Sequence, residues 1–286
     1  MKTFLMAAFF AVSFCFTTQA QEADKDNLMD YKEMLESALE SGQYQQASQK
    51  WDARINQLSG DVQVKIDDRE DWIKVTEPVP LDSNDRIKTG HDGYAEIALD
   101  DKGIIRLERN SEVEISSIEQ ADSEIGLILG SIVAKIQNIF GSKHNLRVKT
   151  PAAVCAVRGT EFAVEYSPLS KETAVAVFDE GKVNVSMTGE EIKDTGEYLL
   201  EKNTEIVLNP MKRRFRPGKI ARMARHRMLF AGLRTKMNGL RKGWKPRSLS
   251  QREELRSRIL RGKLIQRQIK KKIRKKKVER RKKIKE

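Results

Sequence analysis

The stretch CAVRGTEFAVEY, residues 155–166, places a cation, a glycine, a hydroxyl and a carboxylate inside an apolar, β-prone run. These four residues follow one another at positions 158–161. Two interpretations are open. The residues are either compact catalytic machinery or the point where a strand turns a corner at its glycine, which tolerates backbone angles that other residues avoid. The rest of the chain decides between them.

The sequence around this stretch, residues 60–210, alternates between apolar and polar side chains as strands do. The clearest segments are 62–66, 72–75, 94–99, 104–108, 112–116, 162–166, 174–178 and 182–186. Many short strands separated by turn residues are typical of a sandwich or barrel, and the polar half of each strand predicts one wet face per sheet. GLILGSIVAK, residues 126–135, reads as two strands joined at a turn.

A helical pattern precedes the β region. Apolar residues recur at helical spacing from Leu28 to Leu39 and again from Tyr44 through Trp51 and Ile55 to Leu58. We therefore expect a helical hairpin over residues 21–59. It resembles a single tetratricopeptide-type helix pair, and it serves either to pack on the β-domain or to dock another protein.

The first 20 residues have the three parts of a secretory signal: Lys2, an apolar run from Phe4 to Phe16, and small and polar residues ending at Ala20. We expect cleavage after Ala20 and a periplasmic or otherwise exported protein. A retained anchor is the alternative, but the run is short for a membrane span. The mature chain keeps Cys155 alone, either as a buried small hydrophobe or for an intermolecular disulfide.

Charge divides the chain sharply. Residues 211–286 contain 32 Lys and Arg against 4 Asp and Glu, whereas residues 1–210 contain 22 basic and 37 acidic residues. An acidic body with a polycationic tail indicates an anionic partner for the tail. That partner is either external or the acidic body of the same chain.

The tail, residues 211–286, is predicted to be helical and partly disordered. Apolar residues at three- and four-residue steps predict a basic amphipathic helix that Pro246 ends, and Ser250 with Glu253 predicts the capping box of a second helix. Outside the cytoplasm, the polyanions available are envelope polymers and lipid headgroups rather than nucleic acid. The candidate anion-binding residues are Arg222, Arg225, Arg227, Lys270, Lys271, Lys272, Arg274, Lys275, Lys276 and Lys277.

Motifs for catalysis or cofactors do not emerge from the sequence. It has no G-x-S-x-G nucleophile elbow and no phosphate-binding glycine loop. His91, His144 and His226 lack partners at metal-ligand spacing. The acidic loop around Asp82 and Asp85 lacks the spacing of a calcium loop, so we interpret it as a solvated turn. We therefore expect a non-enzymatic protein without metal or cofactor.

Within residues 81–188, four pieces follow one another in an order that resembles the FecR family: LDSNDRIKTG (81–90), GLILGSIVAKI (126–136), LRVKTPAAVCAVRGTEFAVEY (146–166) and TAVAVFDEGKVNVS (173–186). The resemblance implies an extracytoplasmic, all-β, jelly-roll-like domain. The family's name-giving members are membrane regulators that pass an iron-transport signal to a sigma factor. This sequence shows neither their cytoplasmic inhibitor segment nor their spanning helix, so only the domain carries over.

The family signature in this chain reads well as structure. Thr150-Pro151 restricts the chain that enters the turn, the glycine permits the corner, and the charged residues on either side pin it. A ligand-contacting role is the alternative. The signature residues are Pro151, Arg158, Gly159, Thr160, Glu161 and Phe162.

Two functions remain in view, with an enzyme acting on wall polymers as a third. The first is an exported binding or scaffold protein whose β-domain or helical hairpin docks an envelope protein and whose tail docks on anionic envelope components. The second is an extracytoplasmic signalling regulator related to the FecR sigma-factor regulators.

Overall fold

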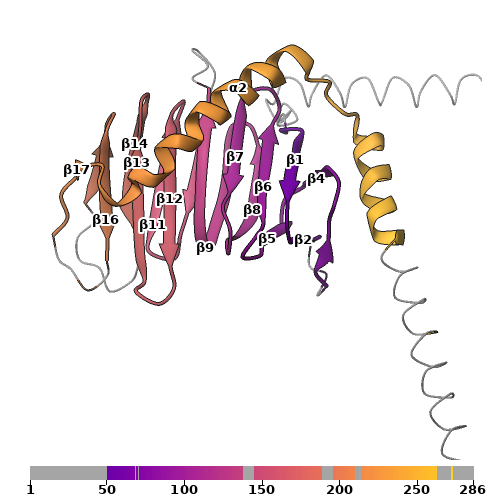
Figure 1. Cartoon of the computed structure of the whole chain (residues 1–286), viewed down its shortest axis with the longest axis horizontal. Coiled ribbons are helices and arrows are strands. Elements are labelled where there is room, and N and C mark those ends of the chain that lie inside the picture. The colour runs from indigo at the N-terminus through magenta and orange to yellow at the C-terminus, as the bar shows by residue number, and fades with distance from the viewer. Residues whose placement is uncertain are drawn as a thin grey trace, which may run out of the picture. The chain divides into compact units, whose positions relative to one another are not determined.

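The computed structural model describes residues 50–262, apart from 68, 70, 138–144, 189–195, 210 and 212–213, together with residue 272. The predicted signal peptide, residues 21–49 of the predicted hairpin and nearly all of the tail beyond residue 262 lie outside the described residues. The described part is mainly β with two helices after the strands, as predicted (Figure 1). Its strands form a large mixed sheet, and the jelly-roll-like sandwich stays a prediction.

The strand pairings form two runs that share β9. The first run has the order β3 (Ile73–Lys74), β2 (Val62–Lys65), β5 (Arg86–Thr89), β8 (Glu112–Glu119), β9 (Asp122–Ile136), β10 (Leu146–Lys149), β11 (Ala153–Arg158), β14 (Lys182–Met187) and β15 (Glu197–Leu200). The second has the order β4 (Val79–Pro80), β1 (Ala53–Ser59), β6 (Tyr94–Leu99), β7 (Gly103–Leu107), β9, β12 (Glu161–Ser167), β13 (Glu172–Val177), β16 (Thr204–Leu208) and β17 (Gly218–Lys219). All eight segments predicted from alternation overlap strands.

The shared strand β9 passes from one run to the other at Gly130. Its first half pairs with β8 and β10, and its second half pairs with β7 and β12. Gly130 has φ +91°, and a Cβ there would lie 2.3 Å from Ser111 Oγ. The prediction of two strands joined at a turn is therefore wrong: one strand bends at a glycine whose backbone angle other residues avoid.

The chain makes a second crossing between the runs in the stretch that decides the fold. Strand β11 ends at Arg158 in the first run, and β12 begins at Glu161 in the second. Gly159 between them has φ +59°, and Thr160 Oγ1 donates a hydrogen bond to the Glu180 carbonyl at 2.5 Å. The stretch is a corner between two strands.

The end of the predicted helical hairpin is a strand. Residues 53–59 form β1, which pairs with β4 and β6. Trp51, Ala53 and Ile55 are all buried. Residues four apart, such as Trp51 and Ile55, share one face of a helix, but they also share one face of a strand, in which every second side chain points the same way. The helical assignment failed here because the apolar spacing of residues 51–58 does not distinguish the two periods.

The two runs differ in burial. Strands of the first run, such as β2 and β5, alternate between buried and partly exposed residues, whereas β6, β12 and β13 are buried along almost their whole length. One apolar core takes side chains from both runs. A second cluster packs β7, β9, β12 and β13 against Met223, Phe230, Leu233 and Met237 from the C-terminal segment. The expectation of one wet face per sheet therefore fails for the second run.

The segment that covers the second run consists of η1 (Arg222–His226) and α2 (Arg227–Gly243), and a C-terminal helix described over residues 249–262 follows it. We call residues 222–262 the strap. Figure 1 shows α2 crossing the row of strands. The C-terminal helix begins with a capping box, but its members are Ser248 and Gln251 rather than the predicted Ser250 and Glu253.

Replacing Gly130 with alanine is expected to destabilise the protein by about 2–4 kcal/mol, because positive φ and overpacking each add strain. Denaturant unfolding of the Gly130→Ala variant measures this loss.

The matched control is Gly232→Ala in α2. A Cβ at Gly232 meets nothing within 4 Å, and alanine favours a helix interior by about 0.8–1.0 kcal/mol over glycine. This variant is expected to be more stable than the wild type. A Gly130→Ala variant as stable as the wild type would contradict the role assigned to the bend.

Candidate functional site: a polar pocket under the C-terminal strap

Three glutamates of the second run are buried under the strap. Glu96 on β6 is 3% exposed, and Glu161 and Glu165 on β12 are 0% and 7% exposed. The strap supplies a basic partner to each: Lys236 to Glu96, Arg234 to Glu161, and Arg225 to Glu165. Burying a carboxylate is costly unless it is paired and hydrogen-bonded, so these glutamates and the strap depend on each other.

Glu161 shows the most complete pairing. Arg234 binds it with two parallel bonds, Nε to Oε1 at 2.7 Å and Nη2 to Oε2 at 2.6 Å, and Lys135 Nζ donates to Oε1 at 3.0 Å. Burial alone would raise the pKa of Glu161. The hydrogen bonds from Arg234 and Lys135 outweigh burial and hold the pKa below its ordinary value. Glu161 is therefore ionised at neutral pH although its side chain is buried.

Glu165 follows the same pattern. Burial raises its pKa, but the hydrogen bond with His226 and the charges of Arg225 and Arg222 bring the pKa below its usual range. His226 is 4% exposed, and its Nε2 lies 2.6 Å from Glu165 Oε1. The carboxylate thus joins β12 to η1.

The C-terminal helix docks on another buried acid. Asp85 is 0% exposed, accepts the backbone N–H groups of Asp67 and Asp82, and pairs with Arg256 through both oxygens. Arg252 donates to the Leu81 carbonyl at 2.8 Å and to Asp82 at 2.7 Å. The interpretation of this loop as a solvated turn is wrong for Asp85, because the strap excludes water from it.

The signature residues differ in burial and in their partners. Phe162 is fully buried, and the turn containing Pro151 is closed by Thr150, whose Oγ1 accepts the Ala153 N–H at 2.9 Å. Arg158 is exposed and has no ion pair with any residue that the structure describes. Glu161 therefore takes its cations from β9 and from the strap instead of from its neighbour in sequence.

Three candidate anion-binding arginines face carboxylates of the same chain. Arg222 pairs with Glu172 at 3.1 Å and Arg227 with Asp179 at 3.2 Å, and Arg225 with Glu165. Lys272 is helical and exposed. Lys270, Lys271, Arg274, Lys275, Lys276 and Lys277 lie outside the described residues.

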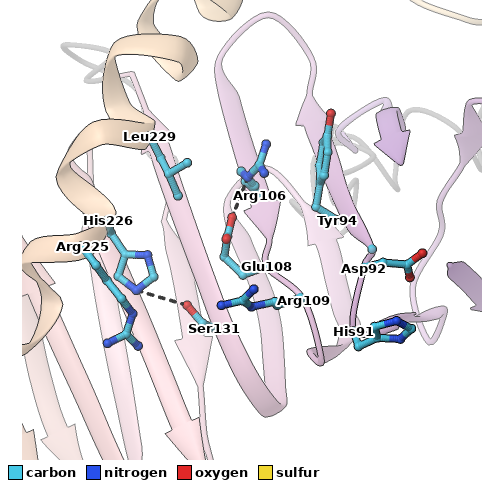
Figure 2. A pocket seen from close by; sticks show the side chains of 11 residues that line it. His91, Asp92, Tyr94, Arg106, Glu108, Arg109, Ser131, Arg225, His226 and Leu229 are labelled. Atoms are coloured by element: carbon cyan, nitrogen blue, oxygen red, sulfur yellow. Dashed lines mark hydrogen bonds and ion pairs between the residues drawn. The ribbon is translucent and has the colours of Figure 1, made fainter. Parts of the chain in front are cut away.

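A cavity of about 650 Å³ opens beside these ion pairs, between the strap and the second run (Figure 2). Strands and their turns contribute one wall, and Arg225, His226 and Leu229 of the strap contribute the other. The lining residues are His91, Asp92, Gly93, Tyr94, Arg106, Glu108, Arg109, Ser131, Arg225, His226 and Leu229. The pocket is the candidate functional site of the described chain.

Ser131, His226 and Glu165 superficially resemble a hydrolase triad. Ser131 Oγ lies 3.5 Å from His226 Nε2, and Glu165 Oε1 lies 2.6 Å from the same nitrogen. In a triad the serine and the acid bind opposite ring nitrogens, so that the acid orients the base. Both partners here meet Nε2, so this arrangement does not activate Ser131.

Cys155 is also unsuited to chemistry. The thiol is fully buried, and burial raises its pKa to about 12. A reactive cysteine needs an accessible thiolate, so Cys155 is a core residue as expected. It is not available for an intermolecular disulfide in this fold.

Other functional features are limited in the residues that the structure describes. Those residues contain no group of three His, Cys, Asp or Glu side chains arranged to hold a metal ion. No helix among them is both long and apolar enough to cross a lipid bilayer.

The sequence did not reveal the pocket, because its walls come from residues as distant as His91 and Leu229. The buried glutamates had a detectable signal. Glu161 and Glu165 lie among apolar residues of one strand, and a chain with a basic amphipathic segment elsewhere offers a partner for such acids. That signal identifies the kind of partner but not which arginine meets which acid.

The described residues form a mainly β domain, and its corner glycine and the buried Glu161 lie in the stretch CAVRGTEFAVEY, residues 155–166. Residues 85–184 match the family model described as FecR protein, so this chain contains a FecR domain, as the sequence resemblance predicted. The match covers only the strand-rich middle of the chain and leaves out the strap.

Two solved structures are similar to this chain, both described as a "putative anti-sigma factor" from Parabacteroides distasonis. The first is 19% identical to this chain with a TM-score of 0.42, and the matched region covers 50% of this chain and 64% of the solved chain. The second is 19% identical to this chain with a TM-score of 0.41, and the matched region covers 48% of this chain and 61% of the solved chain. This chain thus spans less than two thirds of either structure. No curated protein matches it.

Replacing Glu161 with glutamine is expected to lower the free energy of unfolding by about 1–3 kcal/mol, because Arg234 and Lys135 lose a charged acceptor. Denaturant unfolding measures the loss. Arg158→Ala is the control and is expected to change stability by less than about 0.5 kcal/mol, as for exposed sites without partners. Equal losses in both variants would contradict the separate roles of these two residues.

Stability is also expected to fall with acid. Since the folded-state pKa of Glu161 and Glu165 lies below the unfolded value of about 4.3, both groups contribute stability above that pH and lose it as pH falls through the lower folded-state pKa. Thermal unfolding between neutral pH and about pH 3 checks this. The difference in unfolding temperature between the wild type and Glu161→Gln should become smaller as the pH falls. An equal difference at every pH would contradict the lowered pKa of Glu161.

Proposed function

We propose that this protein is a non-enzymatic, extracytoplasmic signalling regulator of the FecR type, which acts by binding an envelope protein through its β-domain. The FecR domain over residues 85–184 carries the proposal. The buried thiol of Cys155 and the unproductive geometry around Ser131 agree with a binding role over a catalytic one.

The strap gives this regulator a means of responding to a partner. It covers the second run through ion pairs with Glu96, Glu161 and Glu165, so a partner that competes for those carboxylates or for the strap would change which surface is exposed. A ligand shifts such an equilibrium only by its difference in affinity for the two states.

A transcription experiment tests the regulatory function. Deleting the gene in the source organism is expected to change a set of transcripts whose promoters share the recognition sequence of one alternative sigma factor. Wild-type protein should restore the pattern. A matched version without residues 1–20 should not, because the proposal places the protein outside the cytoplasm. An unchanged transcriptome, or rescue by the version without the leader, would contradict the proposal.

A second candidate function is docking on anionic envelope lipids or polymers through the end of the tail. Residues 263–286 contain 14 Lys and Arg against 2 Glu, and polycations bind polyanions by releasing counterions. Arg222, Arg225 and Arg227 already pair with the domain, so the proposal rests on Lys270–Lys272 and Arg274–Lys277.

Vesicle co-sedimentation separates these contributions. Deleting residues 263–286 is expected to abolish binding to vesicles that contain an anionic lipid, while Arg222→Ala should leave it nearly unchanged. Binding should weaken with salt and be absent on zwitterionic vesicles. Equal binding by the full chain and the truncated chain would refute the role of the tail.

A further inference from the structure

Two hydrogen-bond donors line the pocket under the strap, the guanidinium of Arg109 and the hydroxyl of Ser131. Arg109 is exposed, and its guanidinium forms no ion pair or hydrogen bond with a residue that the structure describes. Ser131 Oγ has one long contact, 3.5 Å to His226. Figure 2 shows the Arg109 side chain directed toward Ser131, so both donors face the same part of the cavity.

The two carboxylates that line the same pocket each have a partner within the chain. Glu108 Oε1 accepts Arg106 Nε at 2.6 Å, and Asp92 Oδ1 accepts the Asp61 N–H at 3.3 Å. Glu165, behind the wall, is held by Arg225 and His226. A pocket with an unpaired guanidinium, beside carboxylates that already have partners, suits a ligand that brings acceptor oxygens of its own.

We propose that this pocket binds a small anion with carboxylate or phosphate oxygens, held by Arg109 and Ser131. The planar guanidinium of arginine presents paired N–H groups that match two oxygens of such an anion. Arg109 supplies the positive charge for the anion, because Arg106 is paired with Glu108 and Arg225 with Glu165. The volume of about 650 Å³ lies within the range of small-molecule sites.

Anion binding is coupled to the position of the strap. Ser131 and Arg109 belong to the sheet, whereas Arg225, His226 and Leu229 belong to the strap, so the cavity has both walls only when the strap is docked. A ligand that binds only the docked state stabilises that state. An anion bound to Arg109 and Ser131 that also contacts the strap wall therefore holds the strap closed, and this inference goes beyond the proposed regulatory function without depending on it.

Isothermal titration with succinate and, separately, with inorganic phosphate tests the site at constant ionic strength. Wild-type protein is expected to show saturable binding of at least one anion, and the preferred one identifies the ligand class. Arg109→Ala should weaken binding at least about tenfold, since a charge-assisted hydrogen bond contributes roughly 1.5–3 kcal/mol. Ser131→Ala should weaken it less.

Arg158→Ala is the matched control, because Arg158 is an exposed, unpaired arginine outside this pocket. It should bind as the wild type does. Equal affinity in the wild type and Arg109→Ala, or no saturable binding of either anion, would overturn the site.

Hydrogen exchange tests the coupling separately. Saturating anion should slow exchange of the α2 amides in wild-type protein but not in Arg109→Ala. Unchanged exchange in a wild-type sample that binds the anion would overturn the coupling.

Discussion

The structure depends on a carboxylate that has been taken out of water. Glu161 begins β12 in the interior, and its charge is sustained by a two-bond contact with Arg234, 73 residues later, and by Lys135 on β9. An unpaired buried charge would cost several kcal/mol, so the sheet and the strap are stable only together. Glu96, Glu165 and Asp85 repeat this arrangement, each meeting a cation from the strap. The acidic body and the basic tail are thus partly neutralised within one chain.

Two glycines allow the chain to reach this arrangement. Gly130 lets β9 serve both runs of strands, and Gly159 carries the chain from β11 to β12 within two residues. The second of these positions sets Glu161 under the strap. The signature stretch therefore turns a corner and, in the same few residues, supplies the acid that the strap binds. It resembled catalytic machinery because the residues for these two structural roles are adjacent, at positions 158–161.

Much of the fold could be predicted from local patterns, and the errors have local causes. Alternation located eight strands, and the glycine predicted the corner. The same reasoning assigned a helix to residues 53–59, because Trp51 and Ile55 satisfy both the helical and the strand period. It also placed Asp85 in water and paired Arg158 with the corner, because a sequence pattern carries no information on what covers a residue. The pocket could not be predicted, since its walls meet only after the strap docks.

The sequence by itself determined the β class, the FecR resemblance, the corner at Gly159 and the division into an acidic body and a basic tail. The β class, the corner and the charge division rest on periodicity, glycine chemistry and composition, whereas the resemblance rests on four short motifs in the order that the family has them. Only the tertiary structure decided that Arg234 meets Glu161 and that Arg256 meets Asp85, and it left the Arg109 guanidinium without an ion pair among the described residues. Charge complementarity requires that buried acids find cations, but many arginines satisfy that requirement equally. For Arg234, the choice is made by the packing of Phe230, Leu233 and Met237 of the same helix on the sheet.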